Sequence, residues 1–175
     1  MIAKIEIGDI TDPQNKRDII IGMNTEMGEV SAIGRPFAKK VVPTALIEFG
    51  SVLTFQFDEK RLLHMIICHH LGHGGWRRAD QYIRFGLDYL WQSPEVGNRP
   101  YSIVQIGSGP IGQRDKADQP AILNAMSNSF LPVVLYVRSE NSSGAKTLVA
   151  EATAERPMTF LQGWSADSGV LAALN

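Results

Sequence analysis

A short apolar run that breaks abruptly into a glycine-rich loop constrains this chain most strongly. Residues 101–106 read Tyr-Ser-Ile-Val-Gln-Ile, and Gly107, Gly109 and Gly112 follow at once. Glycine tolerates positive φ angles and lets a ligand approach the main chain closely, so the backbone N–H groups of such a loop can converge on phosphate oxygens. The pattern predicts a strand that ends in an anion-binding loop.

The composition is that of an ordinary globular chain. It has 175 residues, 44% of them hydrophobic, and its 17 basic and 18 acidic residues leave a net charge of −1. This length predicts one domain. The excess of Lys and Arg that is typical of nucleic-acid-binding proteins is absent from the sequence. No signal peptide and no apolar stretch of membrane-spanning length is evident, so we expect a cytoplasmic protein without a membrane partner.

Apolar runs with strand character alternate along the chain with runs of helical character. The run at 18–24 shows no polar alternation, which is typical of a strand covered on both faces. This order predicts an α/β sheet with helices on both faces. We expect strands at 2–7, 18–24, 45–49, 52–57, 62–68, 101–106 and 130–137, and helices at 37–41, 78–92 and 120–128.

Polar or glycine-rich residues stand at the ends of four of these strands. They are Asp9, Asn24, His69 and the loop at 107–112. In α/β sheets the ligand crevice lies at the carboxyl ends of the strands. We therefore expect these residues to line one rim.

The C-terminal part of the chain is harder to interpret. Residues 139–144 resemble a linker, and residues 145–175 alternate short apolar pieces with polar ones. This tail either packs back as a strand and a helix or contributes to an oligomer contact. We expect residues 1–138 to form the domain and residues 139–175 to form an extension packed on it.

Four motifs in this order resemble the macro domain, the ADP-ribose-binding module. Residues 8–11 are similar to its Gly-Asp-Ile-Thr sequence, and residues 18–24 are similar to the strand leading into its ribose loop. Residues 63–67 resemble its His-containing strand, and residues 106–112 resemble its second phosphate loop. The resemblance covers residues 1–138 and implies a three-layer α/β/α fold with a mixed central sheet.

The resemblance also implies a role for individual residues. Asp9 would accept a hydrogen bond from the adenine amino group while the Ile10 backbone holds the base, and Asn24 would contact the distal ribose. Asp9 as the cap of a turn, and Asn24 as a tight-turn residue, are the alternative interpretations. Two loops would enclose the diphosphate: Gly28 and Val30 from the first, and Gly107, Ser108, Gly109, Pro110, Ile111 and Gly112 from the second.

The chain departs from the macro-domain pattern at two places. The first phosphate loop of that family usually has several consecutive glycines, whereas residues 27–31 read Met-Gly-Glu-Val-Ser, and Glu29 would repel a diphosphate unless it points away. The family's Asn-Ala-Ala-Asn sequence is replaced by Gly-Met-Asn-Thr at 22–25. The Asn that many catalytic members use at the first position is therefore missing.

Three functions remain open. The first is binding of ADP-ribose or a related adenine nucleotide derivative, with an ADP-ribosylated protein as a further partner. The second is hydrolysis, which removes ADP-ribose from a modified substrate or phosphate from ADP-ribose phosphate, with Asn24 or His69 holding the water. The third is a non-catalytic structural or assembly protein with a decayed site. None of them requires a cofactor.

Other motifs are weaker. The chain has no Gly-Lys-Ser/Thr of a Walker loop, and the glycine spacing of a Rossmann fingerprint at 107–112 leads into Gln-Arg-Asp instead of an apolar helix. The histidines at 64, 69, 70 and 73 lie among glycines that disfavour a helical metal pair, so we expect no metal there. Cys68 lies in an apolar run and predicts a buried, inert thiol. Residues 76–78, Trp-Arg-Arg, either contact a phosphate or form a solvent-facing helix start.

Overall fold

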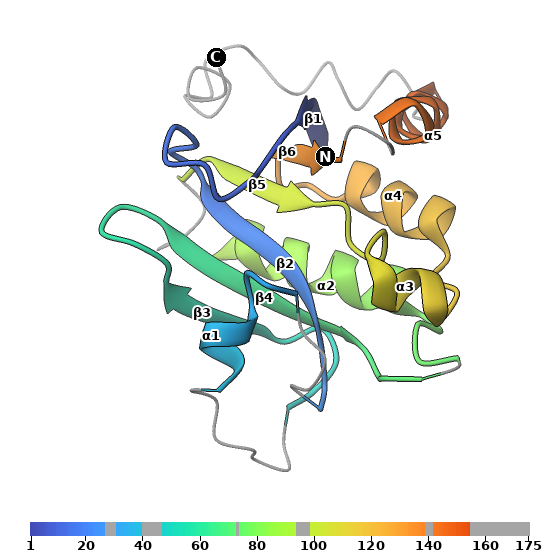
Figure 1. The fold of residues 1–175 in the computed structure, drawn as a ribbon. Helices are drawn as coiled ribbons and strands as arrows, with labels where there is room; N and C mark the ends of the chain where they lie inside the picture. The colour runs from blue at the N-terminus through green and yellow to red at the C-terminus, as the bar shows by residue number, and fades with distance from the viewer. Residues whose placement is uncertain (27–30, 40–46, 73, 94–98, 139–141, 155–175) are drawn as a thin grey trace.

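The computed structural model describes residues 1–26, 31–39, 47–72, 74–93, 99–138 and 142–154. These residues form a six-stranded sheet in the order β1-β6-β5-β2-β4-β3 (Figure 1). All neighbouring strands run parallel except β3, which pairs antiparallel with β4 at one edge. The strands are β1 Ile2–Ile7, β2 Asp18–Asn24, β3 Val52–Gln56, β4 Leu62–His69, β5 Tyr101–Val104 and β6 Val133–Val137. The helices are α1 Arg35–Ala38, α2 Ala79–Gln92, α3 Pro110–Arg114, α4 Gln119–Asn128 and α5 Ser142–Ala154.

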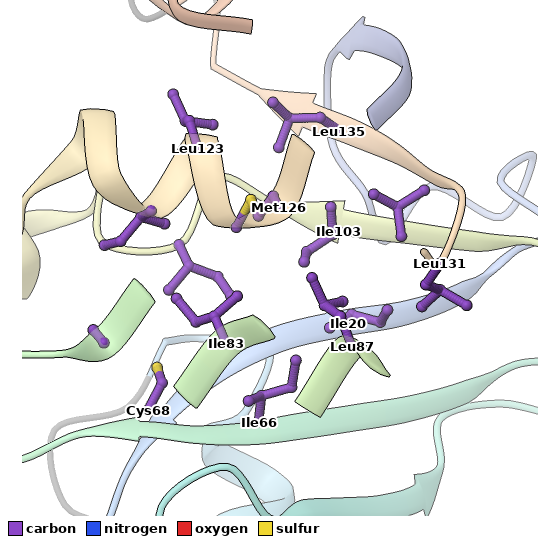
Figure 2. Close-up of a cluster of buried hydrophobic side chains, with 14 of the residues drawn as sticks. Ile20, Ile66, Cys68, Ile83, Leu87, Ile103, Leu123, Met126, Leu131 and Leu135 are labelled. Atoms are coloured by element: carbon purple, nitrogen blue, oxygen red, sulfur yellow. The ribbon is translucent and has the colours of Figure 1, made fainter. Parts of the chain in front are cut away.

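Both faces of the sheet are covered, which explains the uninterrupted apolar run of β2. Ile20 points into a core that includes Ile83 and Leu87 of α2 and Leu123 of α4 (Figure 2). The neighbouring residues Ile19 and Ile21 lie in a second core on the other side of the sheet. Successive side chains of a strand point to opposite faces of the sheet. Consecutive residues of β2 therefore enter different cores, and both sets must be apolar. The result is a mixed sheet between two helical layers.

The predicted strand at 45–49 is wrong for residues Ile47–Phe49, and residues 45–46 lie outside the described ranges. The chain turns here, with Gly50 at φ +83° and its N–H donating to the Ile67 carbonyl at 2.8 Å. The Phe49 ring stacks on Tyr82 of α2 with a centroid distance of 4.5 Å. Phe49 therefore covers a helix instead of occupying a strand position.

Residues 142–154 form α5, which packs against α4 and contacts β1. Ala145 is buried in the core that α2 and α4 share, with Val149 packed against it. This part of the tail therefore packs on the domain as a helix, and residues 155–175 lie outside the described ranges. No helix within these ranges combines the length and apolar character needed to cross a bilayer.

Candidate ligand-binding crevice

A crevice of about 940 Å³ opens at the carboxyl ends of the parallel strands. It brings together residues that are far apart in the chain. The residues expected to bind a ligand, Asp9, Ile10, Asn24 and the loop at 107–112, all line it, and so does the candidate catalytic residue His69. Gly28 and Val30, expected on the opposite wall, lie outside the described residues. Parallel strands end at the same edge of a sheet, which is why these dispersed residues meet.

Asp9 follows β1 in a turn that its own side chain caps. Its Oδ1 accepts hydrogen bonds from the Thr11 hydroxyl at 2.7 Å and from the Thr11 backbone N–H at 2.8 Å. These bonds, the one from the hydroxyl first, hold the pKa of Asp9 below its ordinary value, so the carboxylate is ionised at neutral pH. Both bonds fall on one oxygen of a carboxylate that has about four acceptor positions. Capping the turn is therefore compatible with accepting a hydrogen bond from a ligand.

The floor of the crevice depends on the close approach of β2 to Ile106. A Cβ added at Gly22 would lie 2.6 Å from Cγ2 of Ile106 and 3.1 Å from Sγ of Cys68, so any larger residue would force the floor apart. Two residues further on, Asn24 is buried and aligned with His69 of β4. The two strand ends are joined by the Thr25 N–H, which donates to the His69 carbonyl at 3.1 Å.

The loop after β5 is held by side chains that bond its carbonyl groups. The amide Nε2 of Gln119 donates to the Ile106 carbonyl at 3.0 Å, and the Ser108 hydroxyl donates to the Gln105 carbonyl at 2.7 Å. Gly107 has φ +78°, and a Cβ there would lie 2.5 Å from Nε2 of Gln119. Glycine is required at this position by both its backbone angle and its surroundings.

The predicted open loop is shorter than the sequence suggests, because a helix begins inside it. Gly109 is the extended N-cap residue of α3, and Pro110 occupies the first helical turn, where its fixed φ angle and missing N–H are tolerated. Gly112 lies within the helix and packs against the loop, since a Cβ there would be 2.0 Å from the Gly107 carbonyl oxygen. The N–H groups of a first helical turn have no acceptor within the helix. The segment thus still offers main-chain donors at the crevice.

At the β4 end of the crevice, His69 stacks on Trp76 with a centroid distance of 3.9 Å and an interplanar angle of 13°. Burial lowers the pKa of His69 to about 4 although the carboxylates of Glu26 and Asp115 oppose this effect, so the imidazole is neutral at pH 7. Its Nε2 and the Trp76 Nε1 are buried without a hydrogen-bond partner within the described part of the chain.

The predictions for Trp76 and Cys68, two residues near His69, have different outcomes. Trp76 is only 8% exposed and lines the crevice, so a solvent-facing helix start is wrong for this residue, while Arg77 and Arg78 are exposed. Stacking on the imidazole buries the indole. The predicted inert thiol is confirmed, since Cys68 is fully buried and burial raises its pKa to about 12.

The other histidines lie apart from one another. His64 is buried within β4, whereas His70 is exposed and its Nδ1 lies 2.6 Å from the Thr25 hydroxyl and 3.1 Å from Oε1 of Glu26. His73 is outside the described ranges. Within these ranges, no group of three or more His, Cys, Asp and Glu side chains is arranged to hold a metal ion.

Sequence reasoning missed three arginines that line the crevice: Arg35, Arg114 and Arg138. Asp9 is the one acidic residue among the described lining residues, so these residues carry an excess of positive charge. Two of the three had a signal in the sequence. Arg138 directly follows a predicted strand, and Arg114 comes two residues after the glycine-rich loop. Arg35 had none, because its place at the crevice depends on the packing of α1, whose residues Phe37 and Ala38 are buried.

No family model and no curated protein matches the sequence. Solved structures do resemble the fold. The alphavirus P23pro-zbd structure aligns with 87% of this chain at a TM-score of 0.60 and 13% identity, and this chain spans 24% of its length. A protein of unknown function from Bacteroides thetaiotaomicron aligns with 77% of this chain and 97% of its own at a TM-score of 0.51 and 15% identity.

A macrodomain protein from Streptomyces coelicolor is also similar. It aligns with 78% of this chain and all of its own at a TM-score of 0.47 and 18% identity. At such identities the likeness concerns the fold alone. With a mixed six-stranded sheet between helical layers and a crevice at the carboxyl ends of its parallel strands, the chain has the three-layer α/β/α fold that its sequence motifs predict.

Proposed function

We propose that the crevice binds ADP-ribose or a related adenine nucleotide derivative. The observation that carries the proposal is the order of the lining groups across the sheet. Asp9 follows β1, the glycine-rich loop follows β5, Asn24 ends β2 and His69 ends β4, and these strands lie in this order in the sheet. Adjacent strands are about 4.8 Å apart, so the groups from Asp9 to Asn24 extend over roughly 14 Å.

The chemistry of the groups follows the same order as the parts of ADP-ribose. An ionised carboxylate such as Asp9 accepts hydrogen bonds only, which suits the adenine amino group. Main-chain N–H groups around Gly107 and Gly112 suit phosphate oxygens. The amide of Asn24 both donates and accepts, which suits the vicinal hydroxyls of a ribose. Base, diphosphate and sugar would therefore lie along the rim in sequence.

The charge of the crevice supports an anionic ligand. The three lining arginines outnumber Asp9 together with the Asp115 carboxylate that pairs with Arg114, although the whole chain has a net charge of −1. A concave site with a surplus of one sign raises the local concentration of ligands of the opposite sign. Positive groups thus line the crevice in which a diphosphate would bind.

Binding can be measured by calorimetry and by thermal unfolding with ADP-ribose. We expect ADP-ribose to raise the unfolding temperature and Asp9→Ala to remove most of that increase. Asp12→Ala is a matched control: Asp12 also caps a turn through its Oδ1, 2.8 Å from the Gln14 N–H, but it does not line the crevice. An unfolding temperature unchanged by millimolar ligand contradicts the proposal and favours a non-catalytic structural or assembly role.

A second candidate is hydrolysis of an ADP-ribosyl bond, favoured by the pairing of Asn24 with His69 at one end of the crevice. With a pKa of about 4, His69 is neutral at pH 7 but a weak base, because general bases work best with a pKa near the operating pH. Asn24 is then the better candidate for orienting a water. Release of free ADP-ribose from a modified protein, lost in Asn24→Ala and retained in His69→Gln, would support this function.

A further inference from the structure

The wall of the crevice formed by α3 carries a guanidinium that is paired with a buried carboxylate. Arg114 lines the crevice, and its Nε lies 2.8 Å from Oδ1 of Asp115 while its second terminal nitrogen lies 3.1 Å from Oδ2. The Asp115 side chain is only 4% exposed, whereas that of Arg114 is 52% exposed. One partner is anchored in the protein and the other reaches the crevice.

We infer that Arg114 determines specificity by contacting the phosphate groups of the crevice ligand and that Asp115 is the positioning residue that orients it. This inference rests on the proposed function. It adds a charged contact to a loop whose main-chain N–H groups carry no net charge.

Asp115 has the contacts of an anchor. Its backbone N–H donates to the Ile111 carbonyl at 2.9 Å, which ties it to α3, and its Oδ2 accepts from the Gly72 N–H at 3.2 Å, which ties it to the segment after β4. Asp115 therefore joins α3 to the segment after β4 and also holds Arg114. A looser pair is Arg84 with Asp88 on α2, whose side chains are 47% and 24% exposed and whose closest atoms are 3.7 Å apart.

The geometry of the pair suits phosphate recognition. Two nearly parallel bonds to Asp115 fix the plane of the guanidinium, so little rotational freedom remains to be lost when a ligand binds. A planar guanidinium presents N–H donors in a rigid fork that matches the oxygens of a phosphate as well as those of a carboxylate. Arg114 lines the same crevice as Gly107, Gly109 and Gly112 of the loop.

Calorimetric titrations with ADP-ribose and with adenosine, which lacks phosphate, test the assignment. Arg114→Gln should weaken ADP-ribose binding about tenfold or more, as expected for the loss of a charge-assisted hydrogen bond, and should leave adenosine binding unchanged. Arg84→Gln removes the same charge far from the crevice and should leave both affinities unchanged. Arg114→Lys should recover only part of the loss, because an ammonium lacks the fork.

Asp115→Asn separates orientation from charge. If Asp115 merely reduces the positive charge of the crevice, its neutralisation should tighten ADP-ribose binding; if it orients Arg114, binding should weaken several-fold and the effect should vanish in an Arg114→Gln background. Ligand-free unfolding curves establish that each variant is folded.

The outcomes distinguish the two levels of the proposal. If the unmodified protein does not bind ADP-ribose, the proposed function fails and the role of Arg114 fails with it. If the unmodified protein binds ADP-ribose and Arg114→Gln binds it equally well, or loses adenosine to the same extent, only the assignment of Arg114 is overturned. Tighter binding by Asp115→Asn overturns the positioning role of Asp115.

Discussion

The two ends of the central sheet use polar residues in opposite ways. At the amino ends of β2, β4 and β5, the buried residues Asn15, Asp18, Arg61 and Ser102 form an amino-end cluster whose members are bonded to one another and to the main chain. At the carboxyl ends, Asp9, Asn24, His69 and Arg114 line an open crevice.

The difference lies in what completes the hydrogen bonds. One terminal nitrogen of Arg61 donates to the carbonyls of Asp12 and Asn15, both at 3.0 Å, and the other donates to that of Thr11 at 3.2 Å. The protein itself supplies these partners, and Oδ2 of Asp18, which has no hydrogen bond among the described residues, lies 2.9 Å from Nε of Arg99 in an ion pair. In the crevice, His69 and Trp76 each keep a buried nitrogen without a partner among the described residues. Buried polar groups without partners are costly, so they are expected where a ligand or water completes the site.

The largest expected effect is on the amino-end cluster. Arg61→Met keeps the apolar stem but leaves the carbonyls of Thr11, Asp12 and Asn15 without their donor, so we expect a loss of about 4 kcal/mol in the free energy of unfolding. Urea denaturation measures it, and Arg84→Met should cost less than about 0.5 kcal/mol because the Arg84 side chain is 47% exposed and approaches Asp88 only to 3.7 Å. The folded Arg61→Met variant should bind ADP-ribose normally. A loss of binding without a loss of stability would contradict the assignment of stability to the amino ends and of ligand binding to the carboxyl ends.

The next effect is a pH dependence that originates at the carboxyl end. The pKa of His69 is lowered from 6.5 to about 4 by burial. Between these values the unfolded chain takes up a proton that the folded protein does not, so stability falls as the pH decreases from about 6.5 to about 4. The contribution is on the order of 3 kcal/mol. Urea denaturation of His69→Gln should show a shallower acid limb.

His70→Gln is the matched control, because His70 is adjacent and its side chain is 53% exposed. This variant should keep the acid limb of the unmodified protein. Equal slopes for His69→Gln and the unmodified protein between pH 4 and pH 6.5 would contradict a buried neutral His69.

A third prediction concerns two glycines of the crevice loop. Gly112→Ala places a Cβ 2.0 Å from the Gly107 carbonyl oxygen, so the backbone must shift, and we expect a loss of about 2 kcal/mol in stability together with weaker ligand binding. Gly109 has φ −76° and no atom within 4 Å of an added Cβ. Gly109→Ala should therefore leave stability unchanged within about 0.5 kcal/mol. Thermal unfolding of both variants measures the contrast, and an equal loss in both would show that the close contact at Gly112 is unimportant.

The contrast between the two ends also explains what the sequence could and could not predict. The strand positions, the sheet covered on both faces and the residues along the rim follow from apolar runs and from the rule that crevices lie at carboxyl ends of strands. Asp9 and Asn24 could be expected at the crevice because Asp9 follows a strand and Asn24 ends one. Asp18 and Ser102 are also polar residues beside apolar runs, yet they belong to the amino-end cluster. Residue type alone does not distinguish a polar residue of the crevice from one of this cluster.

What the sequence did not predict depends on contacts between distant residues. Trp76 lines the crevice because its ring stacks on His69, and no local pattern encodes that pairing. Phe49 has strand propensity, but the contact with Tyr82 overrides it. Arg114 follows a glycine-rich loop, but its orientation comes from Asp115, whose burial is decided by the tertiary structure.

The smallest expected effect concerns the carboxylate at the β1 end of the crevice. The hydrogen bond from the Thr11 hydroxyl is the largest cause of the lowered pKa of Asp9, and Thr11→Val removes it while the bond from the Thr11 backbone N–H remains. The pKa of Asp9 should therefore rise toward its ordinary value but not reach it. A protonated carboxyl is a poorer acceptor for an adenine amino group, so ADP-ribose binding by Thr11→Val should begin to weaken at a higher pH than binding by the unmodified protein, with equal affinities at pH 7. An NMR titration of the Asp9 carboxyl carbon measures its pKa, and calorimetry at each pH measures where ADP-ribose binding begins to weaken. If the pKa of Asp9 rises while the pH dependence of binding stays the same, Asp9 caps its turn without contacting the ligand.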